Sequence, residues 1–289
     1  MENNALVIGG DDRSFLLYTL LKRRGVATDL YGFDKRGLDT VDSLKNIGTY
    51  SYIILPIPYL MEQNNIKAPF CSKKISIDQW ELHKDQTVFL GAVGKNSQFL
   101  ESFQGELVNF LEDPTYVEKN AALTALITVG LIPIKYGVCP VRRKTLICGY
   151  GKIASKVADL LHGQRAQITV AARSELAQAQ IQGRGYDFIP IYDLESRIGE
   201  FDLIINTVPS WVINKRELKK VKGGCLIIDV ASKPGGVDWQ TAQQLKVLAY
   251  LEPGLPGIYT PKEEAENLLQ VVLRHMQEPI CYEGSDGLI

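Results

Sequence analysis

The chain has 289 residues, a length that favours two domains over one. Hydrophobic residues make up 45% and charged residues 22%, which is ordinary for a soluble globular protein. The net charge of −1 gives no reason to expect binding to nucleic acid or to an anionic membrane. The longest apolar stretch, residues 121–134, is shorter than the roughly 20 residues that span a bilayer. The N-terminus has no basic region before an apolar core, so we expect no signal peptide and a cytoplasmic location.

The cysteines point to a reducing compartment. Five of them are scattered along the chain without a C-x-x-C pair: Cys71, Cys139, Cys148, Cys225 and Cys281. Cys148 and Cys225 lie in apolar runs, where cysteine usually behaves as a small hydrophobic residue. We therefore expect no disulfide and no structural metal.

The first half of the chain alternates apolar runs with helical patterns. Strand-like runs cover residues 5–10, 28–33, 51–55, 87–92 and 107–111, and a helix follows the first of them over 15–21. This alternation predicts a parallel, wound α/β sheet. The turn Gly9-Gly10-Asp11 places acidic residues at a helix N-terminus, where they repel phosphate, so we expect no nucleotide there. A long apolar helix over 113–134 follows, and Pro133, Gly137 and Pro140 mark a linker.

A strand, a glycine turn and a helix begin the second half. Residues 145–148 predict a strand, Gly149, Gly151 and Ala154 form G-x-G-x-x-A, and Lys152 and Ile153 begin a helical pattern. Gly149 allows the tight turn, and Gly151 lets backbone approach a phosphate, while the helix N-terminus supplies unpaired N–H groups. This layout predicts a dinucleotide site, and the alternative is a purely structural βαβ turn.

The end of the next strand, residues 168–172, indicates which dinucleotide binds. An NAD-preferring site has an Asp or Glu there for the ribose 2′-hydroxyl, whereas this chain has Arg173 and Ser174. A guanidinium and a hydroxyl suit a 2′-phosphate, so we expect NADP, with NAD as the alternative. Otherwise Arg173 is a solvated residue at a strand end.

Three later strands, over residues 201–208, 225–231 and 247–251, end in loops that gather at the carboxyl edge of the sheet, where ligands bind. A helix over 176–181 precedes these strands, and a last amphipathic helix covers 262–275. Candidate contacts to the ribose or nicotinamide are Asn206, Thr207, Val208, Pro209 and Ser210. Candidate groups for a substrate carboxylate are Ser232 and Lys233, with Arg13 as a bidentate clamp from the first domain.

None of the three histidines, His83, His162 and His275, lies in a loop beside the proposed cofactor. A 2-hydroxy acid dehydrogenase needs a positioned base, most often His, so this activity is disfavoured. A substrate that becomes aromatic when it is oxidised needs a strong base less.

In these residues the chain resembles the A-subunit family of dipicolinate synthase, the sporulation enzyme of endospore-forming bacteria. The matching segments run nearly end to end: Gly9-Gly10-Asp11-x-Arg13, Asn206-Thr207-Val208-Pro209-Ser210, Asp229-Val230-Ala231-Ser232-Lys233-Pro234-Gly235-Gly236 and Pro253-Gly254-Leu255-Pro256-Gly257-Ile258. The resemblance implies oxidation of a dihydropyridine dicarboxylate from the lysine pathway to dipicolinate with NADP. It also implies that the partner is a flavoprotein-like B subunit, and that the protein is a homo-oligomer in the cytoplasm of the mother cell.

One segment departs from the family pattern. The family has Pro-Thr-x-Glu-Gly after the residue that matches Asn120, which the resemblance marks as a site residue. This chain keeps Asn120 and Thr124 but has Leu126 and Ile127 in place of the acid and the glycine. The departure leaves two alternatives: a cofactor-binding subunit without chemistry that regulates its partner, or an oxidoreductase for another cyclic imino acid.

The sequence thus predicts an α/β protein with two Rossmann-like parallel-sheet domains and a cleft between them. Residues 1–140 form the substrate and partner domain with the linking helix, and residues 141–260 form the NAD(P)-binding domain. Residues 261–289 form a C-terminal helix that packs back on the first domain.

Overall fold

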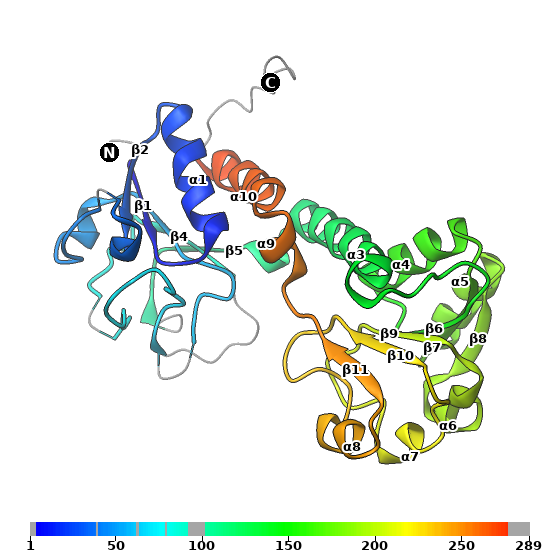
Figure 1. Ribbon diagram of the computed structural model, residues 1–289. Coiled ribbons are helices and arrows are strands. Elements are labelled where there is room, and N and C mark those ends of the chain that lie inside the picture. Colours follow the sequence, from blue (N-terminus) through cyan, green and yellow to red (C-terminus); the bar gives the residue numbers. More distant parts are fainter. Residues whose placement is uncertain (1–3, 39, 62–63, 79, 92–101, 277–289) are drawn as a thin grey trace. The chain divides into compact units, whose positions relative to one another are not determined.

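The computed structural model describes residues 4–38, 40–61, 64–78, 80–91 and 102–276 (Figure 1). They form two compact units. The first unit comprises the chain up to Lys119 together with the segment from Thr260 onward, and the second is Asn120–Tyr259. The long helix therefore contributes most of its length to the second unit, whereas the sequence analysis assigned all of it to the first. Two of the residues discussed above, Ala92 and Cys281, lie outside the described residues.

The first unit is built on a five-stranded parallel sheet in the order β2-β1-β3-β4-β5. Its strands are β1 (Asn4–Ile8), β2 (Ala27–Tyr31), β3 (Tyr52–Ile54), β4 (Thr87–Leu90) and β5 (Glu106–Asn109). Two helices, α1 (Asp12–Arg23) and α10 (Pro261–His275), pack against each other and share a hydrophobic core with one face of this sheet. Strand alternation separates the faces: Ala5 and Val7 belong to the core under these helices, and Leu6 and Ile8 belong to the opposite core.

The second unit has a six-stranded parallel sheet in the order β11-β10-β9-β6-β7-β8. The strands are β6 (Lys144–Cys148), β7 (Gln167–Ala172), β8 (Asp187–Pro190), β9 (Leu203–Asn206), β10 (Leu226–Asp229) and β11 (Leu248–Leu251). In chain order this is the doubly wound order 3-2-1-4-5-6 of dinucleotide-binding folds, with its direction of winding reversing between β6 and β9.

Helices cover both faces of this second sheet (Figure 1). On one face lie α3 (Pro114–Tyr136), α4 (Lys152–Gly163) and α5 (Glu175–Gly183), and on the other lie α6 (Leu194–Arg197), α7 (Lys215–Leu218) and α8 (Trp239–Gln244). The short α9 (Leu255–Tyr259) ends the unit. Ile147 of β6 points to the first layer, and its neighbours Leu146 and Cys148 point to the second.

Helix α3 differs from its prediction in two ways. It continues through Pro133 to Tyr136, so Pro133 lies in the last helical turn and not in a linker. Within the part of the chain that the structure describes, it is the one helix long and apolar enough to cross a membrane by length and composition, with 39% of the tested window buried. Its buried residues Val129 and Ile132 pack in the core of the second unit, as a core helix does.

Candidate functional site

The glycine turn predicted from the sequence connects β6 to α4 at the point where the winding of the second sheet reverses. Gly149 has φ +96°, and a Cβ there would lie 2.6 Å from Thr207 Oγ1. Gly151 is the N-cap residue of α4, and a Cβ there would meet no atom within 4 Å. The first glycine is therefore required by the turn itself, and the second borders open space at a helix N-terminus that a ligand phosphate can enter.

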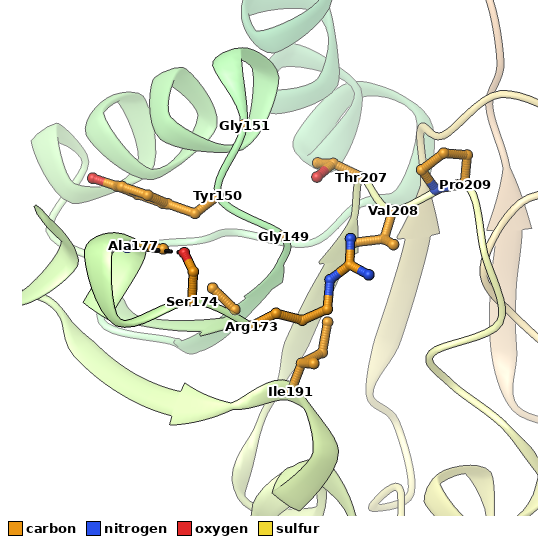
Figure 2. Close-up of a pocket in the computed structure, with 11 residues that line it drawn as sticks. Gly149, Tyr150, Gly151, Arg173, Ser174, Ala177, Ile191, Thr207, Val208 and Pro209 are labelled. Carbon is orange, nitrogen blue, oxygen red and sulfur yellow. Dashed lines mark hydrogen bonds between the residues drawn. The ribbon is translucent and has the colours of Figure 1, made fainter. Parts of the chain in front are cut away.

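A cavity of about 390 Å³ lies over this turn (Figure 2). Its lining brings together seven of the predicted cofactor residues: Gly149, Gly151, Arg173, Ser174, Thr207, Val208 and Pro209. Of the remaining predicted cofactor residues, Lys152, Ile153 and Ser210 do not line it. The sequence analysis missed Tyr150, Ala172, Ala177 and Ile191. Ile191 follows β8, a strand that we did not predict, and its apolar neighbours around Pro190 were the available signal.

Two side chains at the end of β7 line the cavity on one side. Ser174 is the N-cap of α5 and accepts a hydrogen bond from the Ala177 backbone N–H at 3.2 Å. Arg173 is exposed, and Figure 2 shows its guanidinium extending toward Val208. The Ser174 hydroxyl can still donate, because its cap bond uses only an acceptor lone pair. An anion here meets one cation, one hydroxyl and the N-terminus of a nine-residue helix.

The opposite wall comes from the loop after β9. The Thr207 hydroxyl donates to the Cys148 carbonyl at 2.9 Å, and the Thr207 backbone N–H donates to the same oxygen at 3.0 Å. Thr207 is therefore a strut between the ends of β6 and β9, a role that the sequence analysis did not predict. The loop holds Val208 and Pro209 at the cavity while its own backbone is fixed to the glycine turn.

A buried carboxylate organises the next loop. Asp229, fully buried at the end of β10, accepts hydrogen bonds from Asn206 Nδ2 at 2.9 Å, the Ala231 N–H at 3.0 Å and the Gly236 N–H at 2.6 Å. Burial raises the pKa of Asp229, although the three donors oppose this effect. Ser232 and Lys233 lie on the loop so held, and both are exposed. Neither lines the 390 Å³ cavity.

The first unit has a charged cluster at the corresponding place in its own sheet, between the ends of β1 and β3. Arg13 Nε and Nη2 each donate to Asp11 at 2.8 Å, and Nη2 also donates to the Ile57 carbonyl at 2.6 Å. Lys67 Nζ lies 2.7 Å from the same carboxylate. The predicted carboxylate clamp thus holds a carboxylate of its own turn, and Lys67, which the sequence analysis missed, adds a second cation.

The electrostatics of this cluster follow from two cations around one carboxylate. Burial alone would raise the pKa of Asp11, but the hydrogen bonds and charges of Arg13 and Lys67 outweigh it and hold that pKa well below its ordinary value of 3.8. Asp11 also caps α1 by accepting from the Arg13 backbone N–H at 3.2 Å. An acidic cap fills the position that a phosphate takes at the glycine turn of the second unit.

The last predicted site residue, Asn120, lies half-buried in α3, as the first residue of the second unit. Its carbonyl accepts from the Thr124 hydroxyl at 2.8 Å. In the departing segment, Leu126 is 58% exposed and Ile127 packs against the core of the second unit. At the other end of α3, Lys135 and Tyr136 both bond the largely buried carboxylate of Glu252, which raises the pKa of Tyr136 together with burial.

Titratable groups elsewhere offer no competing centre among the described residues. The four cysteines that the structure describes are free thiols, and burial raises the pKa of Cys148 and of Cys225 to about 12. No group of three or more His, Cys, Asp and Glu residues within the described part of the chain could hold a metal ion. The candidate site is therefore the glycine turn of the second unit with the loops after β7, β9 and β10.

Two parallel α/β sheets, the second with the doubly wound order and a glycine turn at its switch point, define a dehydrogenase-like protein of Rossmann type. Comparison with known families agrees for each part. Residues 4–108 match the model of the N-terminal domain of the dipicolinate synthase A subunit, and residues 139–250 match that of the shikimate / quinate 5-dehydrogenases.

The chain is related to the A subunit of dipicolinate synthase along nearly its whole length, which confirms the resemblance found from the sequence. It is 26% identical to that protein of Bacillus subtilis (strain 168), over 96% of this chain and 97% of the relative. The crystal structure of the A subunit of dipicolinate synthase from Bacillus halodurans superposes with a TM-score of 0.85 at 26% identity, covering 96% of this chain and 99% of that one. An L-alanine dehydrogenase structure shares the fold alone, with a TM-score of 0.57 at 14% identity over 96% of this chain and 91% of that one.

Proposed function

We propose that this protein is an NADP-dependent oxidoreductase subunit that oxidises a dihydropyridine dicarboxylate to dipicolinate during sporulation. The single observation that carries the proposal is the open helix N-terminus at Gly151, with Arg173 and Ser174 at the end of the neighbouring strand. The relation to the A subunit of dipicolinate synthase supplies the substrate class.

The residues of the cavity fit a dinucleotide with a 2′-phosphate. Open space at Gly151 and the N–H groups of Lys152 and Ile153 suit a pyrophosphate, and Arg173 with Ser174 suits the 2′-phosphate. Val208 and Ile191 give the adenine apolar walls, and Pro209 and Ser210 continue toward the ribose and nicotinamide. When bound, the oxidised nicotinamide supplies a hydride acceptor.

The chain's own residues then have to bind and orient the substrate. The dihydropyridine loses a hydride and a proton, and the ring becomes aromatic, so the proton leaves an acidified position and needs no strong base. Lys233 and Ser232 are proposed to bind one carboxylate, because both are exposed on a loop whose backbone is fixed by Asp229. Arg13 and Asn120 remain proposed substrate contacts, with the excess positive charge of the Arg13–Lys67 pair over Asp11 favouring an anion.

We test the proposal by single turnover with the purified chain, with and without a B subunit, by following reduced nicotinamide and dipicolinate. Lys233→Ala should lower kcat/KM by about 10- to 100-fold, the equivalent of one charge-assisted hydrogen bond to a carboxylate. Lys219→Ala, which removes an exposed lysine beside α7, is the matched control and should leave turnover unchanged. Arg13→Ala should also lower turnover sharply, and its unfolding curve has to be measured beside it, since Asp11 loses its main partner. Equal turnover in Lys233→Ala and wild type would remove Lys233 from the site.

A second candidate function is a cofactor-binding subunit that regulates a partner without chemistry of its own. The exposed apolar Leu126, in the segment that departs from the family pattern, favours it. The same experiment separates the two, because this candidate predicts cofactor binding without single turnover by the chain alone. A substrate panel of cyclic imino acids separates both from an oxidoreductase for another ring.

We propose in addition that the partner is a flavoprotein-like B subunit, that the chain forms a homo-oligomer, and that it works in the cytoplasm of a sporulating mother cell. The curated relative is named as one of the lettered subunits of a synthase, which supports a second, different subunit. Co-purification of tagged chain with the B subunit, followed by light scattering, measures both assembly states.

A further inference from the structure

We propose that Asp229 is a positioning residue that couples the cofactor loop after β9 to the Ser232–Lys233 loop after β10, so that the two loops hold one fixed geometry. The inference rests on the proposed function for its catalytic consequence. The coupling itself is a property of the hydrogen bonds and can be measured without any cofactor.

Strand register places the coupled residues side by side. In the parallel pair β9–β10, Asn206 stands opposite Asp229, each the last residue of its strand. Both side chains are fully buried, and they bond at 2.9 Å through Asn206 Nδ2 and Asp229 Oδ1. The two loops therefore begin from a pair of side chains that share one hydrogen bond and no solvent.

Each side chain of the pair also holds its own loop. Asn206 donates to the Val208 carbonyl at 3.0 Å and accepts from the Val208 N–H at 3.2 Å. Asp229 accepts from the Ala231 and Gly236 N–H groups, the first and last residues of the segment that carries Ser232 and Lys233. The carboxylate thus closes one loop, and the amide fixes the other, through a single shared bond.

Two glycines allow this close approach. A Cβ at Gly235, where φ is +85°, would lie 2.6 Å from Asp229 Oδ2, and a Cβ at Gly236 would lie 2.5 Å from Asn206 Nδ2. The carbonyl of Gly236 in turn accepts from the Val212 N–H at 3.0 Å and the Ile213 N–H at 2.9 Å, which returns the second loop to the first. The loops are joined at both ends, so a change at Asp229 reaches both.

Charge balance requires a carboxylate rather than an amide at this position. Every group that Asp229 faces through its side chain is a neutral N–H donor, and no cation contacts it in the described structure. Asp229→Asn keeps the shape but turns one acceptor into a donor, which must then face either the Gly236 N–H or the pair of donors at Oδ1. Donor against donor in a buried site breaks the bond and moves the loop.

The test measures hydrogen exchange and catalysis on the full chain. Asp229→Asn should speed amide exchange in peptides covering both 207–212 and 231–236, including Val208 and Val212, whose amides do not bond Asp229. Asn206→Ala should loosen 207–212 while the bonds from Asp229 to Ala231 and Gly236 persist. Asp202→Asn, which removes a backbone-bonded carboxylate at the amino end of β9, is the control and should change neither peptide.

Catalysis supplies the readout that a purely structural role would not move. Asp229→Asn should lower kcat by about 100-fold, as expected for a displaced reacting group, while 2′-phospho-ADP-ribose, which lacks the nicotinamide, binds with unchanged affinity. Faster exchange confined to 231–236 would overturn the coupling, as would wild-type kcat in a folded variant. If Asp229→Asn does not fold, unchanged exchange at 207–212 in Asn206→Ala overturns it equally. Wild-type protein that binds no NADP would refute the proposed function and leave the exchange test valid.

Discussion

The choice between NADP and NAD depends on Arg173, and its removal gives the most decisive prediction. Arg173→Ala should weaken NADP binding and leave NAD binding nearly unchanged. The side chain is exposed at the end of β7, on the lining of the cavity beside Ser174 (Figure 2). A 2′-phosphate at this position would accept a charge-assisted hydrogen bond from the guanidinium, whereas the 2′-hydroxyl of NAD would not attract it by charge.

The expected magnitude follows from the exposure of the side chain. A hydrogen bond to a charged group is worth about 1.5 to 3 kcal/mol, and solvent screening at an exposed arginine favours the lower part of that range. A loss of about 1.5 to 2 kcal/mol corresponds to an NADP dissociation constant raised about 10- to 30-fold. Because Arg173 also packs beside the proposed adenine position, NAD should lose no more than about threefold.

The assay is a direct titration of both cofactors, by calorimetry or protein fluorescence, at low and at high salt. Wild type should prefer NADP, and this preference should fall as salt rises. Arg216→Ala is the control, because it removes an exposed arginine of α7 that does not line the cavity. Equal weakening of NADP and NAD would place Arg173 on a part that both share, and a wild-type preference for NAD would refute the argument.

Two further predictions concern the turns of the two units. Gly149→Ala should cost about 2 kcal/mol of stability, from a positive φ and a Cβ 2.6 Å from Thr207 Oγ1, whereas Gly151→Ala should cost at most about 1 kcal/mol at the helix cap and weaken cofactor binding, since its Cβ enters open space. Equal melting temperatures of these two variants would contradict the turn geometry. Asp11→Asn should cost about 2 kcal/mol at neutral pH. Because the folded pKa of Asp11 is lowered, its contribution is present above the unfolded value of 3.8 and is lost as the pH falls below it. Denaturant curves at several pH values measure this, and a deficit that persists in acid would show that the Asp11 charge is not its cause.

Much of the site could be predicted from the sequence because its signals are local. The glycines of a βαβ turn, the residue that ends the second strand and the loop after a buried strand all lie at fixed offsets from strands that composition identifies. Seven predicted residues accordingly line one cavity. The strand β8 was missed because it has four residues and begins with a charged one, and Ile191 was missed with it.

The partners of charged side chains could not be predicted. Arg13 was expected to hold a substrate carboxylate, and in the structure its guanidinium donates to Asp11, two residues earlier, and to the Ile57 carbonyl. Lys67 reaches the same carboxylate from 56 residues away, a separation that no periodic pattern carries. Long-range ion pairs depend on which loops the sheet brings to one edge, and this is a property of strand order.

By itself, the sequence determined that two parallel α/β sheets form, that the turn of the second begins a phosphate-compatible helix, and that Arg173 follows the neighbouring strand. Periodicity and turn chemistry act over a few residues, so the order of residues is enough to specify them. Only the tertiary structure decided that Asn206 and Asp229 meet and that the loop of Lys233 closes on a buried carboxylate. It also decided that α3 continues through Pro133. These features arise from register between strands and from packing in the core, where residues distant in the chain share one low-dielectric site.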